Sequence, residues 1–371
     1  MIVGVPKEIK VREYRVGLTP PVVREMTRAG VRVLVQSGAG AEIGFSDEDY
    51  QKAGAAIVPE AGEVWSASEL IIKVKEPQAS EIRLMREGQL LFTFLHLAPD
   101  PEQAKGLLAA GVTAIAYETV TDDRGGLPLL APMSAIAGRM SVQAGAEALL
   151  MTHGGRGTLL AGVPGVEPAR VTILGGGTAG TNAARISSAL GAETTVLDVS
   201  ARRLQELDGM FLGRIETVHA NRDNIERHVT CSDLVIGAVL VPGAAAPRLV
   251  GVELIRAMPR GSVVVDISID QGGVFETSHP TTHDAPTFIR HGVVHYCVAN
   301  MPGAVARTST FALSNATEGY AQKLALKGLD ALREDRHLQN GLNVHKGRVT
   351  HKAVAEALGL PCTPAPMALG D

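Results

Sequence analysis

The chain of 371 residues is predicted to adopt an α/β fold built on doubly wound, mostly parallel sheets. Three observations predict this class. Short apolar runs rich in β-branched residues alternate with helical patterns, glycines follow many of those patterns, and a glycine-rich turn joins a strand to a helix near the middle. The length favours two domains, and a hydrophobic share of 45% can supply both with a core.

The first 130 residues alternate strand and helix. Thr19 is expected to cap a helix at residues 20–29, which Gly30 ends. Strands are expected at residues 2–5, 31–35, 70–74, 90–95 and 112–116, and further helices at residues 47–53 and 102–110. This order predicts a mostly parallel sheet with helices on both faces.

The rest of the chain continues the pattern between two long helices. The first is expected at about residues 135–152, with Ser134 as its N-cap, and the second at about residues 310–333. Strands are expected at residues 171–174, 194–197, 234–238, 263–267 and 293–298. The tail, residues 345–371, is expected to contain one short helix and a loose end.

This element order predicts a discontinuous first domain, which the second interrupts. The first domain would comprise residues 1–134 and 304–371, and the second residues 135–303. The two long helices would bridge the domains, with the active-site cleft between them. In open α/β sheets, ligands bind beyond the carboxyl ends of the strands.

The turn within residues 171–198, VTILGGGTAGTNAARISSALGAETTVLD, predicts a Rossmann-like dinucleotide site. Gly175 allows the tight turn out of the strand. Gly177 lets a pyrophosphate approach the helix N-terminus, and Gly180 lets the helix pack close to the sheet. Asp198 follows at the distance where a carboxylate holds both ribose hydroxyls. The alternative is a glycine-rich turn in an ordinary α/β domain.

The charge of Asp198 favours NAD as the cofactor, because it would repel the 2′-phosphate of NADP. Arg202 and Arg203 follow closely and would soften that preference. The net charge of −4 gives no reason to expect a nucleic-acid partner, and no apolar run approaches the ~18 residues of a membrane helix. The three cysteines form no CxxC pair, which favours reduced thiols and a cytoplasmic location.

Polar residues follow several apolar strands and form a candidate site. Lys75 and His96 each follow a strand, Arg15 lies in the loop after the first strand, and Asp266 and Asp270 end another strand. Arginine can bind a carboxylate through two hydrogen bonds, and histidine suits proton transfer near neutral pH. Each residue also has a structural alternative, namely a solvated strand end, a structural histidine, a turn cap or a surface arginine. Together with NAD, the set indicates oxidation of a small acid that bears an amine or hydroxyl group.

The chain resembles the alanine dehydrogenases (alanine dehydrogenase/transhydrogenase family) over essentially its full length. The matching segments are GVPKEIKVREYRVGLTP at 4–20, KVKEP at 73–77, LFTFLHLA at 91–98, APMSAIAGRM at 131–140, LGGGTAG at 174–180, VIGAVLVPGA at 235–244, VDISIDQGG at 265–273 and VANMPGAVARTST at 298–310. The resemblance implies reversible oxidative deamination of L-alanine to pyruvate and ammonium, with NAD as hydride acceptor.

The resemblance also implies roles for individual residues. Arg15 and Lys75 would bind the substrate, and His96 and Asp270 would be the catalytic pair. The cofactor site would comprise Ser134, Gly175, Gly177, Thr178, Gly180, Asp198, Arg203, Val239, Leu240, Ile267, Asp270, Asn300 and Met301. The family is typically hexameric, so a homohexamer is expected. Some members have a metal site made by a Glu and a His where this chain has Lys323 and Lys327, so no metal is expected.

Three other functions remain open at this stage. A lysine-type relative such as saccharopine dehydrogenase shares the architecture but accepts larger partners. The soluble nucleotide-binding part of a transhydrogenase, and a nucleotide-binding regulator without turnover, would both bind NAD without oxidising alanine. An assay of NADH oxidation with pyruvate and ammonium separates these functions from alanine dehydrogenase activity.

Overall fold

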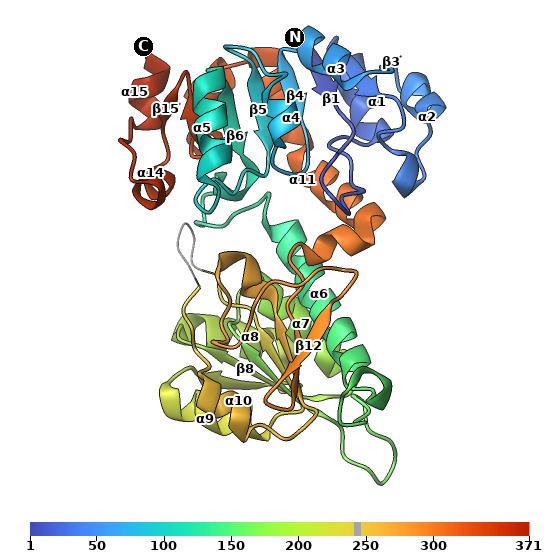
Figure 1. The fold of residues 1–371 in the computed structure, drawn as a ribbon, viewed down its shortest axis with the longest axis vertical. Coiled ribbons are helices and arrows are strands. Elements are labelled where there is room, and N and C mark those ends of the chain that lie inside the picture. Colours follow the sequence, from blue (N-terminus) through green and yellow to red (C-terminus); the bar gives the residue numbers. More distant parts are fainter. Residues whose placement is uncertain (241–245, 371) are drawn as a thin grey trace. The chain divides into compact units, whose positions relative to one another are not determined.

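The computed structural model describes residues 1–240 and 246–370. They form two compact units, which we call the terminal unit (Met1–Met133 with Val305–Asp371) and the central unit (Ser134–Ala304). These limits lie within one residue of those expected for the two domains. The predicted class is confirmed, since each unit is a mainly parallel sheet covered by helices (Figure 1).

The described part of the terminal unit contains an eight-stranded sheet in the order β15-β14-β6-β5-β4-β1-β2-β3. The strands are β1 (Ile2–Val5), β2 (Arg32–Gln36), β3 (Ala56–Val58), β4 (Leu70–Ile72), β5 (Leu90–Thr93), β6 (Thr113–Ala116), β14 (Leu342–His345) and β15 (Arg348–Val349). Strands β1 to β6 pair in parallel, whereas β14 pairs antiparallel with β6 and with β15. The carboxyl ends of β4, β5 and β6 therefore share one edge.

Helices surround this sheet, and the apolar side chains of β4 to β6 are buried among them. The helices are α1 (Pro20–Arg28), α2 (Asp47–Lys52), α3 (Ala61–Ala67), α4 (Ala79–Ile82), α5 (Pro101–Ala110), α11 (Ala306–Lys327), α12 (Asp330–Glu334), α13 (Arg336–Gln339), α14 (Lys352–Leu358) and α15 (Ala365–Gly370). Helix α1 begins after Thr19 as expected, but the Thr19 hydroxyl contacts Ser314 rather than capping the helix.

The described part of the central unit contains a seven-stranded sheet in the order β12-β13-β11-β10-β7-β8-β9. The strands are β7 (Arg170–Leu174), β8 (Glu193–Asp198), β9 (Glu216–His219), β10 (Leu234–Gly237), β11 (Val263–Asp266), β12 (Thr287–Arg290) and β13 (Val293–Tyr296). All pair in parallel except β12, an antiparallel edge strand. The helices are α6 (Ala131–Ala148), most of which lies in this unit, α7 (Thr178–Ala189), α8 (Ala201–Phe211), α9 (Arg222–Cys231) and α10 (Val252–Ala257). Two apolar clusters form its core.

Three expected features are wrong. Helix α6 begins at Ala131, so Ser134 lies inside its first turn and is not its N-cap. The second long helix ends at Lys327, because Gly328 takes a φ of +57° that a continuing helix cannot adopt.

The third difference is the tail, which is more ordered than expected. Strands β14 and β15 form a hairpin whose connecting residues, Lys346 and Gly347, both have positive φ, as a two-residue turn of type I′ requires. Helices α14 and α15 follow it, where one helix and a loose end were expected. The tail thereby extends the terminal sheet beyond β6.

Candidate active site

Lys75 and His96 emerge from the same edge of the terminal sheet. Strands β4 and β5 are parallel neighbours, and the pairing continues past their ends, where the Phe94 N–H donates to the Val74 carbonyl over 3.2 Å. The Thr93 hydroxyl then donates to the Lys75 carbonyl over 2.9 Å. The two residues predicted at strand ends therefore lie at the carboxyl edge, where ligands of such sheets bind.

A buried charged triad lies directly beneath this edge. Lys73 is completely buried, and its ammonium group donates to Glu8 over 3.0 Å and to Glu81 over 2.7 Å. Burial favours the neutral amine, but the two carboxylates outweigh it and raise the pKa of Lys73, so the side chain stays charged at neutral pH. Burial raises the pKa of Glu8, although Lys73 opposes that shift.

The triad fixes the backbone that carries Lys75. One oxygen of Glu8 accepts from the N–H groups of Val74 (2.7 Å) and Lys75 (3.3 Å). The Tyr117 hydroxyl donates to the Lys73 carbonyl over 2.9 Å. With the β5 contacts, every backbone N–H and C=O of residues 73–75 has a partner. The position of the Lys75 side chain is therefore set by a fully hydrogen-bonded segment.

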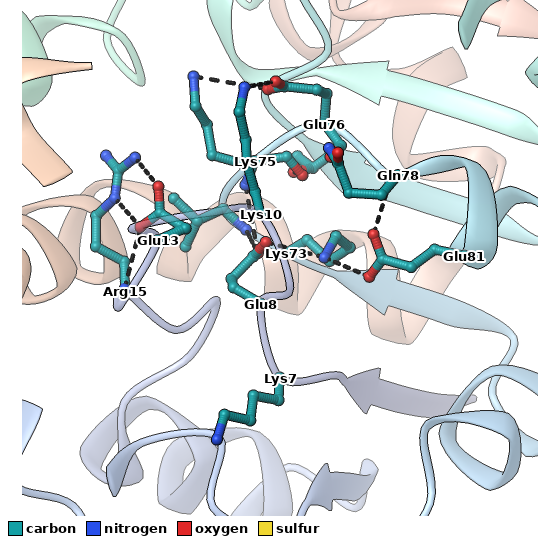
Figure 2. A network of polar contacts seen from close by, with 12 residues as sticks. Lys7, Glu8, Lys10, Glu13, Arg15, Lys73, Lys75, Glu76, Gln78 and Glu81 are labelled. Atoms are coloured by element: carbon teal, nitrogen blue, oxygen red, sulfur yellow. Dashed lines mark hydrogen bonds and ion pairs between the residues drawn. The ribbon is translucent and has the colours of Figure 1, made fainter. Parts of the chain in front are cut away.

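The Lys75 ammonium group lies 3.6 Å from one carboxylate oxygen of Glu76, and the other oxygen of Glu76 contacts Lys10 (Figure 2). Burial alone would raise the pKa of Glu76, but the two ammonium groups outweigh it and lower that pKa. Lys75 is itself largely buried. A cation in this setting is a point charge of fixed position, which suits binding of an anionic substrate group.

Arg15 is buried, so the alternative that it is a surface arginine is wrong. Only 2% of it is exposed, and its Nε and Nη2 atoms donate to Glu13 over 2.6 and 2.5 Å. Gly17 keeps this loop against β4, because a Cβ there would lie 2.5 Å from the Ile72 carbonyl oxygen. In Figure 2, the Arg15 and Lys75 side chains extend toward the same side of the network.

His96 differs from these buried cations. Its side chain is 40% exposed, and its ring stacks on Phe94 with centroids 5.7 Å apart. Its φ of +48° is uncommon for a residue other than glycine. Among these predicted terminal-unit residues, His96 alone combines partial exposure with a ring that can both accept and donate a proton.

The glycine-rich turn of the central unit has the geometry that a phosphate site needs. Gly175 takes a φ of +98°, and a Cβ on Gly180 would lie 1.8 Å from the Gly175 carbonyl oxygen. A Cβ on Gly177, by contrast, would meet nothing within 4 Å among the described residues. Gly177 is also the N-cap of α7 and offers no side chain to its N–H groups. The open space in front of an uncapped helix N-terminus fits a pyrophosphate group.

Asp198 and Arg203 fix this turn from the neighbouring strand and helix. Asp198 accepts from the Gly176 N–H over 2.7 Å, and the Arg203 Nε donates to the Gly176 carbonyl over 2.7 Å. Arg203 also donates to the Thr181 hydroxyl over 2.5 Å. The acid expected to bind the ribose therefore lies beside the glycine turn, at the end of β8.

The other predicted cofactor residues follow parallel strands of the same sheet. Val239 follows β10, Ile267 follows β11, and Asn300 and Met301 follow β13, so they lie toward the carboxyl edge at which Gly175 leaves β7. Ser134 lies on α6, one turn before Gly138, where a Cβ would lie 2.0 Å from the Ala179 carbonyl oxygen of α7. Thr178 is exposed at the start of α7, and Leu240 is 45% exposed. Residues 241–244 of the predicted motif lie outside the described residues.

Asp266 and Asp270, the two aspartates at the end of one predicted strand, lie in different environments. Asp266 is completely buried and accepts from the N–H groups of Ser268 (3.2 Å) and Val274 (3.0 Å). Burial raises its pKa to about 6, against the effect of these hydrogen bonds. Asp270 is exposed in the 3₁₀ helix Ile267–Gln271. Asp266 is thus a structural residue, and Asp270 is the one available to a ligand.

The residues at the family's metal position are engaged in ion pairs. Lys323 donates to Asp335 over 2.8 Å, and Lys327 contacts Glu334. Across residues 1–240 and 246–370, no three His, Cys, Asp or Glu side chains are grouped so as to hold a metal ion. Among the helices in those ranges, none is both long enough and apolar enough to cross a membrane.

Sequence reasoning missed the carboxylates that support the predicted residues. Glu8, Glu13 and Glu118 contact the backbone or side chains of predicted site residues or their neighbours, and Glu81 contacts Lys73 beneath them. Except for Glu13, which lies two residues before Arg15, nothing in their spacing connects them with the site. The one available signal was Lys73, a charged residue inside the apolar run LIIKV. A lysine in a buried strand requires a carboxylate partner, which predicts a buried acid elsewhere in the chain.

Comparisons with known proteins agree with this architecture. Models of the alanine dehydrogenase/PNT N-terminal and C-terminal domains match residues 4–137 and 141–352. The alanine dehydrogenase of Halomonas elongata is 57% identical over 371 residues, the full length of both chains, and that of Mycolicibacterium smegmatis is 54% identical over 98% of this chain and 99% of its own.

Solved structures give the same result. An L-alanine dehydrogenase superposes with a TM-score of 0.93 at 51% identity, covering 97% of this chain and 99% of its own. A transhydrogenase from Sinorhizobium meliloti, at 24% identity and a TM-score of 0.82 over 94% of this chain and all of its own, shares the fold. The chain belongs to the alanine dehydrogenase/PNT family.

Proposed function

We propose that this protein catalyses the reversible oxidative deamination of L-alanine to pyruvate and ammonium, with NAD as the hydride acceptor. The full-length similarity to alanine dehydrogenases supports the reaction. The observation that carries the proposal is the terminal sheet edge, where the buried Glu8 binds the backbone of Lys75 and the neighbouring strand leads to a partly exposed His96. This edge offers a site for a small anion together with a group that can transfer protons.

The terminal unit would bind the substrate through its acid group. Arg15 and Lys75 carry positive charges in buried surroundings, where their attraction for a carboxylate is stronger than in water. Their supports, Glu13 and Glu8, restrict movement of the two cations, so the substrate would be held in one orientation. Such positioning contributes several kcal/mol to lowering a reaction barrier.

When bound, NAD supplies a nicotinamide ring that accepts a hydride from Cα of alanine. The resulting iminium group adds water and then releases ammonium, leaving pyruvate. In this scheme, the imidazole of His96 accepts protons from the reacting groups and returns them in later steps. Such proton transfer contributes roughly 10²–10⁴-fold to the rate. Asp270, exposed in the central unit, is assigned to stabilise the positive charge of the iminium.

Family membership implies a nicotinamide cofactor, and we assign NAD rather than NADP from Asp198. Its carboxylate lies beside the glycine turn, where it would accept from ribose hydroxyls and repel a 2′-phosphate. Gly177, Thr178 and the start of α7 would hold the pyrophosphate. The homohexamer, implied by the family resemblance, and the cytoplasmic location, inferred from the cysteine pattern, stay predictions. Light scattering tests the first.

The test is an assay of NADH oxidation with a panel of 2-oxo acids, with ammonium or lysine as the amine, repeated with NADPH. We expect turnover with pyruvate and ammonium, and faster turnover with NADH than with NADPH. Activity only with lysine and 2-oxoglutarate would indicate a saccharopine-type enzyme. NADH binding without any turnover would indicate a nucleotide-binding protein, and either result would overturn the proposal.

A further inference from the structure

Glu118 contacts the backbone of His96 and has no role in the function described so far. It lies in the 3₁₀ helix Tyr117–Thr119, directly after β6, whose Ala116 pairs with Thr93 of β5. One oxygen of its carboxylate accepts from the His96 N–H over 2.7 Å. Both oxygens lie 3.2 Å from the N–H of Leu95. The carboxylate therefore binds two successive amides at the end of β5.

This contact bears on the unusual backbone of His96. A non-glycine residue with a φ of +48° is in a sparsely populated, strained conformation, which persists only where its surroundings hold it. Hydrogen bonds to a carboxylate are stronger than those to a neutral acceptor, so these contacts can hold that conformation. Only 15% of the Glu118 side chain is exposed, so water competes weakly for its oxygens.

Glu118 forms its hydrogen bond with the main chain of His96 rather than with its ring. The nearest carboxylate oxygen is 3.9 Å from Nδ1, which exceeds hydrogen-bond distance. The ring is instead oriented by its parallel stacking on Phe94. Fixing the backbone N–H of His96 therefore determines where the imidazole leaves the sheet edge.

The same arrangement occurs one strand away. Glu8 accepts from the successive N–H groups of Val74 and Lys75 after β4, as Glu118 does from those of Leu95 and His96 after β5. Two carboxylates from different segments thus bind paired amides at adjacent strand ends. In each case, the second amide belongs to a residue of the predicted site.

We propose that Glu118 is a positioning residue for His96, holding its backbone in the left-handed conformation from which the imidazole reaches the substrate. The proposal rests on the function proposed above. Loss of the carboxylate lets residues 95–96 relax toward extended backbone, and the ring moves with them. Since a misplacement of about 1 Å can cost on the order of 10²-fold in rate, the effect falls on kcat.

The test compares Glu118→Ala, Glu118→Gln, His96→Ala and the double variant His96→Ala/Glu118→Ala. We expect Glu118→Ala to lower kcat by roughly 10–100-fold with little change in the KM for pyruvate. The Gln variant keeps one acceptor oxygen and should recover part of the loss. Because Glu118 acts through His96, adding Glu118→Ala to His96→Ala should lower kcat no further.

Hydrogen exchange supplies a readout that does not depend on turnover. In Glu118→Ala, the amides of Leu95 and His96 should exchange faster, while those of Val74 and Lys75 remain as in the wild type. An unchanged kcat, fully additive losses in the double variant, or unchanged exchange at residues 95–96 would each overturn the proposal. If Glu118→Ala does not fold, Glu118→Gln, which preserves the side-chain volume, provides the same readouts.

The two proposals fail in distinguishable ways. A wild-type protein that does not oxidise NADH with pyruvate and ammonium would contradict the proposed function. The proposed effect of Glu118 on the backbone of residues 95–96 would still be tested by their exchange rates. Conversely, an active wild type whose kcat is insensitive to Glu118 would retain the proposed function and remove Glu118 from it.

Discussion

The two units present different chemical groups at the carboxyl ends of their strands. In the terminal unit, the carboxyl edge is built from charged side chains, with Lys73 and Arg15 buried against carboxylates. In the central unit, the corresponding edge presents backbone, a glycine turn whose Gly176 peptide is bound by Asp198 and Arg203. The difference fits the proposed division of ligands, a small acid in the first unit and a long anionic cofactor in the second.

The largest expected effect separates chemistry from cofactor binding. His96→Ala should lower kcat by about two to four decades, because it removes the proposed proton-transfer group of the terminal unit. NADH affinity, assigned to the central unit, should stay close to that of the wild type. Steady-state kinetics and fluorescence titration on one preparation measure both, and a near-wild-type kcat would remove His96 from the chemistry.

The next effect concerns the stability of the terminal unit. Lys73→Met leaves Glu8 and Glu81 buried without their cation, which should cost about 3–5 kcal/mol of unfolding free energy. Lys10→Met is the matched control, since Lys10 is 37% exposed beside Glu76 and its loss should cost about 1 kcal/mol or less. Denaturant unfolding compares the two. Equal losses would show that the buried triad contributes no more than a surface ion pair.

A pair of glycine variants tests the backbone site of the central unit. Gly180→Ala forces a Cβ against the Gly175 carbonyl and should cost about 1–3 kcal/mol of stability. Gly177→Ala meets open space, so its stability should be preserved while its NADH affinity falls. Thermal unfolding and NADH titration separate the two effects. If Gly177→Ala binds NADH as well as the wild type, the pyrophosphate does not approach that position.

The smallest effect is a pH dependence from two buried groups of the central unit. The pKa of Asp266 is raised by burial to about 6, so its contribution to stability is present below pH 3.8 and is lost as pH rises through 6. Burial lowers the pKa of His295 to about 4, so its contribution is present above pH 6.5 and is lost as pH falls toward 4. The two slopes oppose each other between pH 4 and 6.

Single variants should reveal each slope. Stability of Asp266→Asn should rise more steeply with pH than that of the wild type between pH 4 and 6, and stability of His295→Gln should rise less steeply. Thermal unfolding across this range measures both. Identical pH profiles for the wild type and both variants would show that neither group changes its protonation on unfolding.

The sequence predicted well what short segments determine. The apolar strands, the glycine turn and the acid at the end of β8 are local patterns, and Lys75 and His96 follow strands that the periodicity identifies. The structure adds what distant residues determine, such as the contact of Glu8 with Lys73, which are 65 residues apart. The hairpin after β14 was missed because its turn, Lys346–Gly347, lies in a short segment that lacks a strong apolar pattern.

Hydrogen exchange of the wild-type protein with and without ligands tests the division of roles most directly. NADH alone should protect the glycine turn and the segment from Asp198 to Arg203. Addition of oxamate, an unreactive analogue of pyruvate, should then protect residues 73–76 and 94–96 of the terminal unit. If NADH leaves the glycine turn unprotected, or if the analogue leaves both strand ends unchanged, then the acid and the cofactor are not bound where this account assigns them.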